Sequence, residues 1–414
     1  MSHQTRTDRR PAPGIARHGR LRRPSGVRTA ALAIVVVAAV AVVSSGSVAA
    51  FAAWDLSRTV QANAVDISDG KAAPPSIGAI DGGANILLAG SDSRVGQGDA
   101  YGNPAEMAGN DHNDVTMLLH ISEDHSRATV LSFPRDLLID RPACQGKDGG
   151  PDVPAKRDSA FNLAMQDGGL PCVVRTVESI TGLDIPYGGV VQFLGVKGIA
   201  AAIGGVPVCL ANPIDDDHAD IHLGAGPQVL QGDDVVGFVR TREGVSDGSD
   251  VGRISNQQVF LSALLRAVTS AGTLGNPAKV YGIARAVVED MRLSTSLDDP
   301  TTIASLALTV KDIPLDRITF LQYPGFRVGQ KVEPDTASAE RMMALIADDA
   351  DFALSPDRAA NGVELPPGAD AQPAPSATPG AGATPSADPS ASAVLPENVM
   401  GQTADAATCS NARR

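Results

Sequence analysis

The chain has 414 residues, of which 20% are charged and only 3% are aromatic, and its formal net charge is −13. Residues 1–28 carry eight arginines and one aspartate, a net +7, so the rest of the chain carries −20. This acidic body excludes the broad basic face that a nucleic acid requires, and the scarcity of aromatic residues excludes a base-stacking platform. Any anion site must therefore be a local cationic pocket.

The N-terminal region is predicted to be a membrane anchor. Residues 1–28 are rich in arginine and are expected to form a disordered cytoplasmic tail. Residues 29–54 are uncharged, and a run of roughly 25 residues is long enough to span a bilayer. The alternative is a cleaved signal peptide, because Ser47-Val-Ala-Ala50 resembles a small-residue cleavage site. We expect a retained single-pass anchor, since the apolar region is long. The arginines before it predict a cytoplasmic N-terminus, with a linker over 55–80 and everything after residue 54 outside the cytoplasm.

Residues 81–350 are predicted to form the folded domain. Short apolar runs predict strands, and periods near 3.6 predict helices. The expected strands are 85–90, 115–121, 128–133, 206–210 and 318–323, and the polar turn at 122–127 makes a hairpin of the second and third. The expected helices are 171–181, 193–203, 232–239, 253–270, 276–290, 300–310 and 337–348. Such a mixture predicts an α/β fold with helices layered around a central sheet.

The C-terminal region is predicted to be mostly a disordered tail. Residues 351–414 are expected to form a tail in which 366–392 are mainly proline, alanine, serine, glycine and threonine, a composition typical of disorder. The last residues, through Cys409, can return to the domain.

Four cysteines follow the anchor, and an even number in an oxidising compartment allows three pairings. We expect Cys144 with Cys172 and Cys209 with Cys409, both as structural bridges.

The stretch from Arg240 to Gln257 concentrates chemistry. Arg240 and Arg242 are two apart, so on an extended segment they point to the same face. Arg253 and Gln257 are four apart at the start of a helical pattern, so they are neighbours on one helix face. Guanidinium forks that converge in this way suit phosphate or carboxylate oxygens. The alternative is a surface web of salt bridges with nearby acidic residues, namely Glu243, Asp247 and Asp250.

Two aspartates sit at predicted strand ends beside these arginines. Asp92 follows the first strand and Asp114 begins the second, so adjacent strand ends bring two carboxylates toward one hard cation. Magnesium takes one or two carboxylates and fills its shell with water and phosphate oxygens. Taken singly, each aspartate is more simply a turn or strand cap. Together with Arg94, Arg135 and the three arginines already named, they predict a metal–pyrophosphate site.

The sequence gives less support to nucleotide-binding, zinc or other metal sites. The phosphate-binding loop G-x-x-x-x-G-K-[ST] and the zinc motif H-E-x-x-H are absent from the sequence. Asp215-Asp-Asp217 with His218 and His222 is expected to be a solvated loop rather than a metal site. Seven apolar residues are candidates for lining a lipid groove, although most are expected to be plain core: Ile199, Ile203, Val206, Val236, Phe238, Phe260 and Leu264.

Over about residues 83–270 the chain resembles the LytR–CpsA–Psr family of Gram-positive cell envelopes. The resemblance is carried by four ordered blocks: Asn85-Ile-Leu-Leu-Ala-Gly-Ser-Asp-Ser-Arg94, Asn113-Asp-Val-Thr-Met-Leu-Leu-His-Ile121, Ser132-Phe-Pro-Arg-Asp136, and Phe238-Val-Arg-Thr-Arg242 through Gly252-Arg-Ile-Ser-Asn-Gln257. It implies an α/β/α fold with a hydrophobic groove for a polyprenyl chain and an arginine-lined mouth for its pyrophosphate. Asp92 and Asp114 correspond to the residues that bind the metal ion in the family, and the ion is expected to be Mg²⁺. The pyrophosphate contacts correspond to Arg135, Arg240, Arg242, Arg253 and Gln257.

The resemblance implies a phosphotransferase that moves a glycopolymer from a polyprenyl-pyrophosphate carrier to peptidoglycan. Teichoic acid and arabinogalactan are both possible polymers. Asp92, Asp114, Arg135 and Arg253 are then the expected catalytic residues. Two positions depart from the family pattern: His112 and Asn256 stand where many members have arginine. These departures favour one alternative, a non-catalytic protein that binds lipid or wall. A separate alternative is a polyprenyl-pyrophosphate pyrophosphatase, which uses the same site with water as the acceptor.

Overall fold

The computed structural model describes residues 26–68, 70, 82–91, 93, 111–245, 248, 250–355, 363–364 and 393–411. The chain divides into two units, Met1–Trp54 and Asp55–Arg414. The helices are α1 (Gly26–Asn63), α2 (Leu163–Thr181), α3 (Phe193–Ile203), α4 (Asp233–Arg240), α5 (Asp250–Thr269), α6 (Ala271–Leu274), α7 (Pro277–Asp290), α8 (Pro300–Asp312) and α9 (Thr336–Ala347). No helix in the described part of the chain combines the length and the apolar character needed to cross a bilayer.

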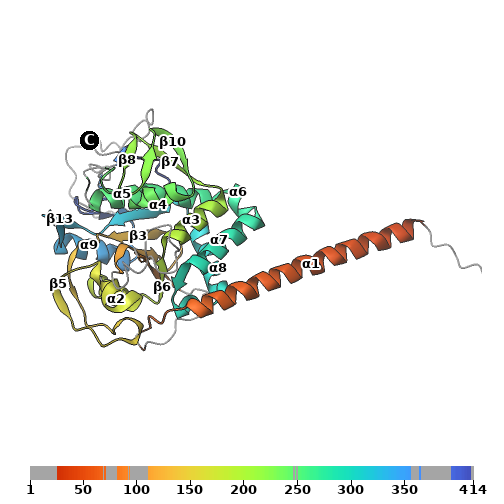
Figure 1. Cartoon of the computed structure of the whole chain (residues 1–414), viewed down its shortest axis with the longest axis horizontal. Coiled ribbons are helices and arrows are strands. Elements are labelled where there is room, and N and C mark those ends of the chain that lie inside the picture. The colour runs from red at the N-terminus through yellow and green to blue at the C-terminus, as the bar shows by residue number, and fades with distance from the viewer. Residues whose placement is uncertain are drawn as a thin grey trace, which may run out of the picture. The chain divides into compact units, whose positions relative to one another are not determined.

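A mixed sheet of seven strands lies at the centre of the second unit, in the order β11-β6-β1-β2-β3-β12-β18 (Figure 1). The predicted hairpin is confirmed, because β2 and β3 pair antiparallel, and β1 pairs antiparallel with β2 and parallel with β6. These strands are β1 (Ala84–Ser91), β2 (Asn113–Ile121), β3 (Ala128–Phe133), β6 (Tyr187–Val191), β11 (Met291–Leu293), β12 (Ile318–Gln322) and β18 (Gly401–Thr403).

Helices cover both faces of this sheet, which makes the fold α/β/α. Successive residues of a strand point to opposite faces. Leu87 and Leu131 accordingly pack with α2 and α9 in one core, whereas Ile86 and Ala128 pack with α7 and α8 in another. Figure 1 shows α2 and α9 together on one side of the sheet. The predicted layering is therefore confirmed.

A second sheet packs against α4 and α5 and has the order β10-β7-β19-β16. Its core is a third apolar cluster, in which Phe238 and Phe260 lie 6.3 Å apart between ring centroids. The strands are β7 (Val206–Leu210), β10 (Gly226–Leu230), β16 (Val363–Glu364) and β19 (Cys409–Ser410). The remaining strands form two-stranded pairs: β4 (Leu138–Arg141) with β5 (Lys156–Ala160), β8 (Ile214–Asp216) with β9 (Ile221–Leu223), β13 (Gly325–Val328) with β14 (Lys331–Pro334), and β15 (Phe352–Ala353) with β17 (Ala393–Val394).

Both predicted disulfides are present, Cys144–Cys172 and Cys209–Cys409. The predicted return of the C-terminal residues is also confirmed. β18 pairs with β12 in the central sheet, and β19 pairs with β7 in the second sheet. The folded domain therefore does not end at residue 350, as the sequence suggested, because its last strands come from residues 401–410.

The predicted linker over 55–80 also differs from the structure where it is described. Helix α1 continues to Asn63, and Val60 is only 2% exposed. The amide of Val65 then donates to the carbonyl of Leu293 at 2.8 Å. Residues 55–68 are therefore not a free linker, because their few apolar side chains pack into the domain. The region 366–392, predicted to be disordered, lies outside the described residues.

Candidate functional site

An apolar cavity of about 330 Å³ opens where strands β1 and β6 end. The start of α3, the end of α4 and the start of α5 complete its walls. Four of the predicted site residues line it together, namely Asp114, Arg240, Arg253 and Gln257. The other lining residues are mainly apolar: Leu88, Gly90, Ser91, Val115, Met117, Val191, Gln192, Phe193, Val196, Val239, Phe260 and Leu261. The cavity thus combines a mainly apolar lining with two arginines.

Arg253 and Gln257 lie on one face of α5, as predicted, and they are only 6% and 4% exposed. Nη2 of Arg253 donates to the backbone carbonyl of Asp114 at 2.9 Å and also pairs with Asp250. Nε2 of Gln257 donates to the carbonyl of Val239 at 3.0 Å. Within the described residues, the buried Nε of Arg253 has no hydrogen-bond partner. Because buried donors are nearly always satisfied, this one indicates a ligand with an acceptor oxygen.

Arg135 follows β3 and stands among three carboxylates. Its Nη1 donates to Asp114 at 2.7 Å, its Nε lies 3.5 Å from Asp136, and its amide donates to Asp250 at 3.0 Å. Burial alone would lower the pKa of Arg135, but these three carboxylates outweigh burial and raise the pKa. Arg135 therefore keeps its charge and holds the carboxylate of Asp114 at the cavity wall.

Arg240 and Arg242 do not share a face, which corrects the prediction. Arg240 is the last residue of α4, and its guanidinium lies 5.0 Å from the ring centroid of Phe193 at the cavity. The amide of Arg242 donates to Asp216, its Nε donates to the carbonyl of Gly248, and it does not line the cavity. The reason is that the segment is not extended, since the helix runs to Arg240 before the chain turns.

Arg242 instead contributes to a second group of charges around Asp136. Burial would raise the pKa of Asp136, but Lys331, Arg135 and Arg242 outweigh burial and lower it. Nζ of Lys331 donates to Asp136 at 3.0 Å. Asp136 therefore stays ionised and ties the Arg135 segment to β14.

The predicted metal site is described only in part, because Asp92 and Arg94 lie outside the described residues. The register of β1 and β2 pairs Ser91 with Asn113, the residues directly before Asp92 and Asp114. Asp114 lines the cavity and offers hard carboxylate oxygens, which are ligands that Mg²⁺ prefers. Among the described residues, Asp114 could therefore supply one carboxylate to a magnesium ion at this strand end.

The two departures from the family pattern lie away from the cavity. Asn256 is 1% exposed, donates to the carbonyl of Phe238 at 2.6 Å and accepts a hydrogen bond from Ser410. It therefore joins α4, α5 and β19 instead of facing a ligand. His112 is half-buried just before β2 and is not among the lining residues. Neither side chain lines the cavity.

Sequence reasoning missed Phe193 and misjudged Asp250. No sequence pattern pointed to Phe193, because its contact with Arg240 forms only where α3 and α4 meet in the fold. Asp250 stands three residues before Arg253, a spacing that predicts a helical ion pair, and that pair is present. The salt-bridge alternative placed it on the surface, but Asp250 is 4% exposed and Arg253 is 6% exposed. The pair therefore belongs to the buried wall of the site.

Three further sequence patterns can be located in the structure. Of the seven candidate groove residues, only Phe260 lines the cavity. Asp215, Asp217 and His222 gather on the exposed β8–β9 hairpin, with potential ligand atoms within 4.8 Å of one another, and hydrogen bonding to Asp215 raises the pKa of His222. The spacing G-x-S-x-G occurs at Gly244–Gly248, between α4 and α5, and its serine lies outside the described residues.

Comparison with known proteins finds relatives named for cell wall biosynthesis and for teichoic acid transfer. The sequence is 33% identical to the cell wall biosynthesis protein LcpA of Corynebacterium glutamicum over 282 residues, which is 62% of this chain and 52% of LcpA. It is 25% identical to the polyisoprenyl-teichoic acid–peptidoglycan teichoic acid transferase TagT of Bacillus subtilis, covering 68% of this chain and 83% of TagT. The chain thus spans about half the length of LcpA.

A solved structure of a LytR-Csp2A-Psr enzyme from Actinomyces oris superposes with a TM-score of 0.51 at 20% identity, covering 68% of this chain and 94% of that one. This likeness bears on the fold alone. The LytR_cpsA_psr family pattern itself matches residues 41–345, most of the chain. The chain therefore belongs to the LytR–CpsA–Psr family.

Proposed function

We propose that this protein transfers a glycopolymer from a polyprenyl-pyrophosphate carrier to a hydroxyl group of peptidoglycan, forming a phosphodiester. The observation that carries the proposal is a cavity whose lining is mainly apolar and also includes Arg240, Arg253 and Gln257. The apolar lining suits part of a prenyl chain, and guanidinium forks suit the oxygens of a pyrophosphate. The printed names of LcpA and TagT, which concern cell wall biosynthesis and teichoic acid transfer, support the same assignment.

The chemistry needs little covalent participation from the protein. The acceptor oxygen attacks the phosphorus that carries the glycan, the bond from that phosphorus to the oxygen bridging it to the lipid phosphate breaks, and lipid phosphate leaves. Arg253 and Arg240 offset the charge that develops on the phosphoryl oxygens. Arg135 orients Asp114 through the contact of 2.7 Å. The proton of the acceptor passes to a carboxylate at the strand end or to water.

Magnesium dependence is part of the proposal. Asp114, together with Asp92, would hold Mg²⁺, which supplies charge neutralisation for the pyrophosphate when bound. Alanine replacement of Asp114 tests its role. Loss of metal binding, measured by calorimetry, assigns Asp114 as a ligand, whereas retained metal binding with lost turnover assigns it as a base.

The proposed location is the outer face of the cell membrane, with a cytoplasmic N-terminus. Its support is the arginine-rich start of the chain and the uncharged run at 29–54, together with two disulfides, which are typical of an oxidising compartment. A topology reporter fused after residue 54 tests it. Activity of a reporter that works only in the cytoplasm would contradict this location.

The transfer itself is tested with the purified full-length protein, a polyprenyl-pyrophosphate-linked sugar, peptidoglycan fragments and Mg²⁺. Mass spectrometry is expected to detect a sugar–phosphate–peptidoglycan adduct with the wild type and none with Arg253→Ala. Free sugar phosphate without an adduct would instead identify a pyrophosphatase. Lipid binding without turnover would identify a binding protein.

A further inference from the structure

A second cavity, of about 560 Å³, adjoins the candidate site and has no role in it. Ser91, the last residue of β1, and Gln192, which follows β6, line both cavities. The first cavity borders Leu88 and Val191, whereas the second borders Val190. Because neighbouring residues of a strand point to opposite faces, the two cavities lie on opposite faces of the sheet and meet at the strand ends. We name the second one the Lys147 pocket.

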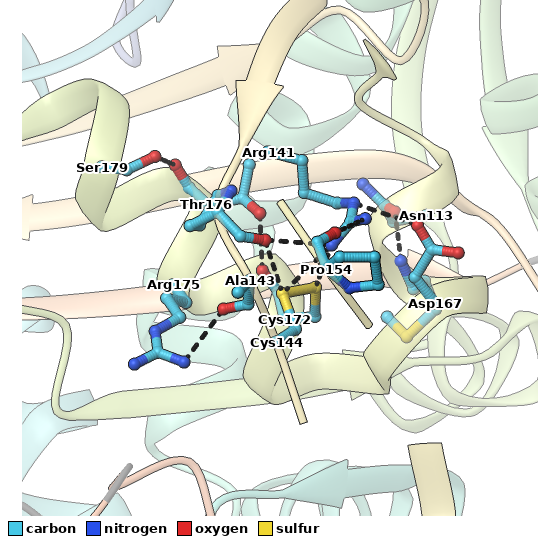
Figure 2. The surroundings of a disulfide bond; sticks show 12 residues. Asn113, Arg141, Ala143, Cys144, Pro154, Asp167, Cys172, Arg175, Thr176 and Ser179 are labelled. Atoms are coloured by element: carbon cyan, nitrogen blue, oxygen red, sulfur yellow. Dashed lines mark hydrogen bonds and ion pairs between the residues drawn. A yellow bond between two sulfur atoms is a disulfide. The ribbon is translucent and has the colours of Figure 1, made fainter. Parts of the chain in front are cut away.

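The walls of the Lys147 pocket are built from segments that the Cys144–Cys172 disulfide holds together. Figure 2 shows this disulfide beside the side chain of Arg141. Arg141 is 3% exposed, donates to the carbonyl of Pro154 at 2.7 Å and lies 3.0 Å from Asp167. The loop after Cys144 and the turn before Cys172 both line the pocket, so its shape is set before a ligand arrives.

Two glycines show how closely these walls approach. A Cβ at Gly168 would lie 2.5 Å from the carbonyl oxygen of Gln145, and one at Gly146 would lie 2.2 Å from that of Pro151. Gly169 has a φ of +66°, a conformation that side chains rarely adopt. These glycines allow the backbone itself to form much of the lining.

The polar lining is mixed in charge. Nζ of Lys147 donates to Asp111 at 2.6 Å, and the hydroxyl of Ser91 also bonds to Asp111. Arg292 and Asp66 face the same cavity, so two cations and two anions balance. A balanced set does not favour a phosphate, which takes a cationic site, and its polarity does not favour a lipid tail. The apolar lining comes from a few residues: Val65, Met165, Leu170, Pro171 and Val190.

This combination suits a saccharide. A sugar offers hydroxyl groups that both donate and accept, and C–H faces that pack on small apolar surfaces. Pockets of about 300–1,000 Å³ with a few polar groups are typical of small-molecule sites. The position is equally specific, since a group attached to a pyrophosphate at the strand ends reaches the Lys147 pocket across Ser91 and Gln192.

We propose that the Lys147 pocket is the saccharide subsite of the enzyme, and this inference rests on the function proposed above. The saccharide is either the first sugar on the lipid pyrophosphate or the sugar of the acceptor. Both present the same chemistry to the pocket.

The test compares two variants with a matched control. Lys147→Met and Arg292→Met each remove a charge and its hydrogen bonds but keep most of the length of the side chain. Lys311→Met is the control, because Lys311 forms an exposed pair with Asp312 at 2.6 Å on α8. Binding is measured by calorimetry for polyprenyl pyrophosphate without sugar, the same lipid with one N-acetylhexosamine, and a peptidoglycan disaccharide.

The expected result is selective. Lys147→Met weakens binding of one sugar-bearing ligand about tenfold, the effect of losing one charge-assisted hydrogen bond, and leaves the sugar-free lipid unchanged. A loss confined to the glycosylated lipid assigns the donor sugar, and a loss confined to the disaccharide assigns the acceptor.

Two results would overturn the inference. One is unchanged binding of both sugar-bearing ligands in both pocket variants. The other is an equal loss for the sugar-free lipid, since Lys147 would then act through Asp111 on the pyrophosphate site. Failure of the proposed function is seen separately, as a wild-type protein that binds these ligands but forms no adduct.

Discussion

At the scale of single residues, Asp216 shows how the protein holds its arginine segment. One carboxylate oxygen accepts from the hydroxyl of Thr241 and the amides of Arg242 and Gly244, and the other accepts from the amides of His218 and Ala219. Burial would raise the pKa of Asp216, but these hydrogen bonds outweigh burial and lower it. The residue is 4% exposed, so its charge anchors the chain where it leaves α4.

Asp216→Asn is therefore expected to destabilise the fold by about 2–3 kcal/mol at pH 7, because an amide group replaces an acceptor facing buried donors. A lowered folded pKa contributes stability that is present above the unfolded value of about 4 and is lost as pH falls through the folded pKa. Urea unfolding should thus show the gap between wild type and variant narrowing below pH 4. A constant gap would contradict this account, and the exposed Asp312→Asn is the control.

Arg253→Lys tests the fork geometry at the cavity. Nη2 of Arg253 serves both Asp114 and Asp250, and a lysine ammonium cannot keep both contacts while presenting a second donor to a ligand. We expect affinity for polyprenyl pyrophosphate to fall about 10–100-fold, measured by calorimetry. The same substitution at Arg285, an exposed partner of Glu289, should have no effect. Unchanged affinity at Arg253 would remove it from the site.

At the scale of elements, α5 is the part to which distant segments attach. Asn256 binds the carbonyl of Phe238 on α4, and Arg253 binds the carbonyl of Asp114 on β2. Near its other end, Arg266 donates to the carbonyls of Ala404 and Ala406 in the C-terminal segment. The helix that carries Arg253 and Gln257 is therefore fixed at both ends by residues far away in sequence.

The two disulfides should differ in their effect on stability. Cys144–Cys172 has a sequence separation of 28, and Cys209–Cys409 one of 200. In the chain-entropy description, closing the longer loop stabilises by about 2 kcal/mol more. The double serine variant of Cys209 and Cys409 should thus lose more unfolding free energy in urea than that of Cys144 and Cys172. The reverse order would show that packing of the reduced state dominates.

The sequence predicted some elements well and others not at all, for physical reasons. β2 and β3 have long apolar runs, so their existence and pairing were predictable. β6 contains Gly188 and Gly189 and was missed, because its place beside β1 depends on parallel pairing and not on local propensity. β18 has three residues after a proline-rich region, and only its partner β12 makes it a strand.

At the scale of the whole molecule, the folded unit reaches from residue 55 to the C-terminus. The sequence suggested a domain at 81–350 because the flanking segments are polar and their compositions change there. The two sites also differ in how far the sequence predicts them. Arg253, Gln257 and Asp114 were predictable from spacing and strand ends, but the Lys147 pocket was not, since it forms where segments far apart in sequence meet.

A chain ending at residue 355 should accordingly be poorly stable. It lacks β18, which pairs with β12, and it lacks the disulfide partner of Cys209. We expect its midpoint of thermal unfolding to fall by more than about 5 °C, the shift that follows from losing a few kcal/mol in a domain of this size. A chain ending at residue 411 is the matched control and should unfold like the wild type. Equal midpoints would show that the domain is complete without its last strands.

The bond between Asn256 and Ser410 joins residues 154 positions apart. Because a ribosome makes the chain from its N-terminus, the helix bearing Arg253 and Gln257 emerges long before the strand that secures it. Chains that stop early thus carry those two groups without this hydrogen bond, so α5 gains its last attachment only when synthesis has passed residue 410.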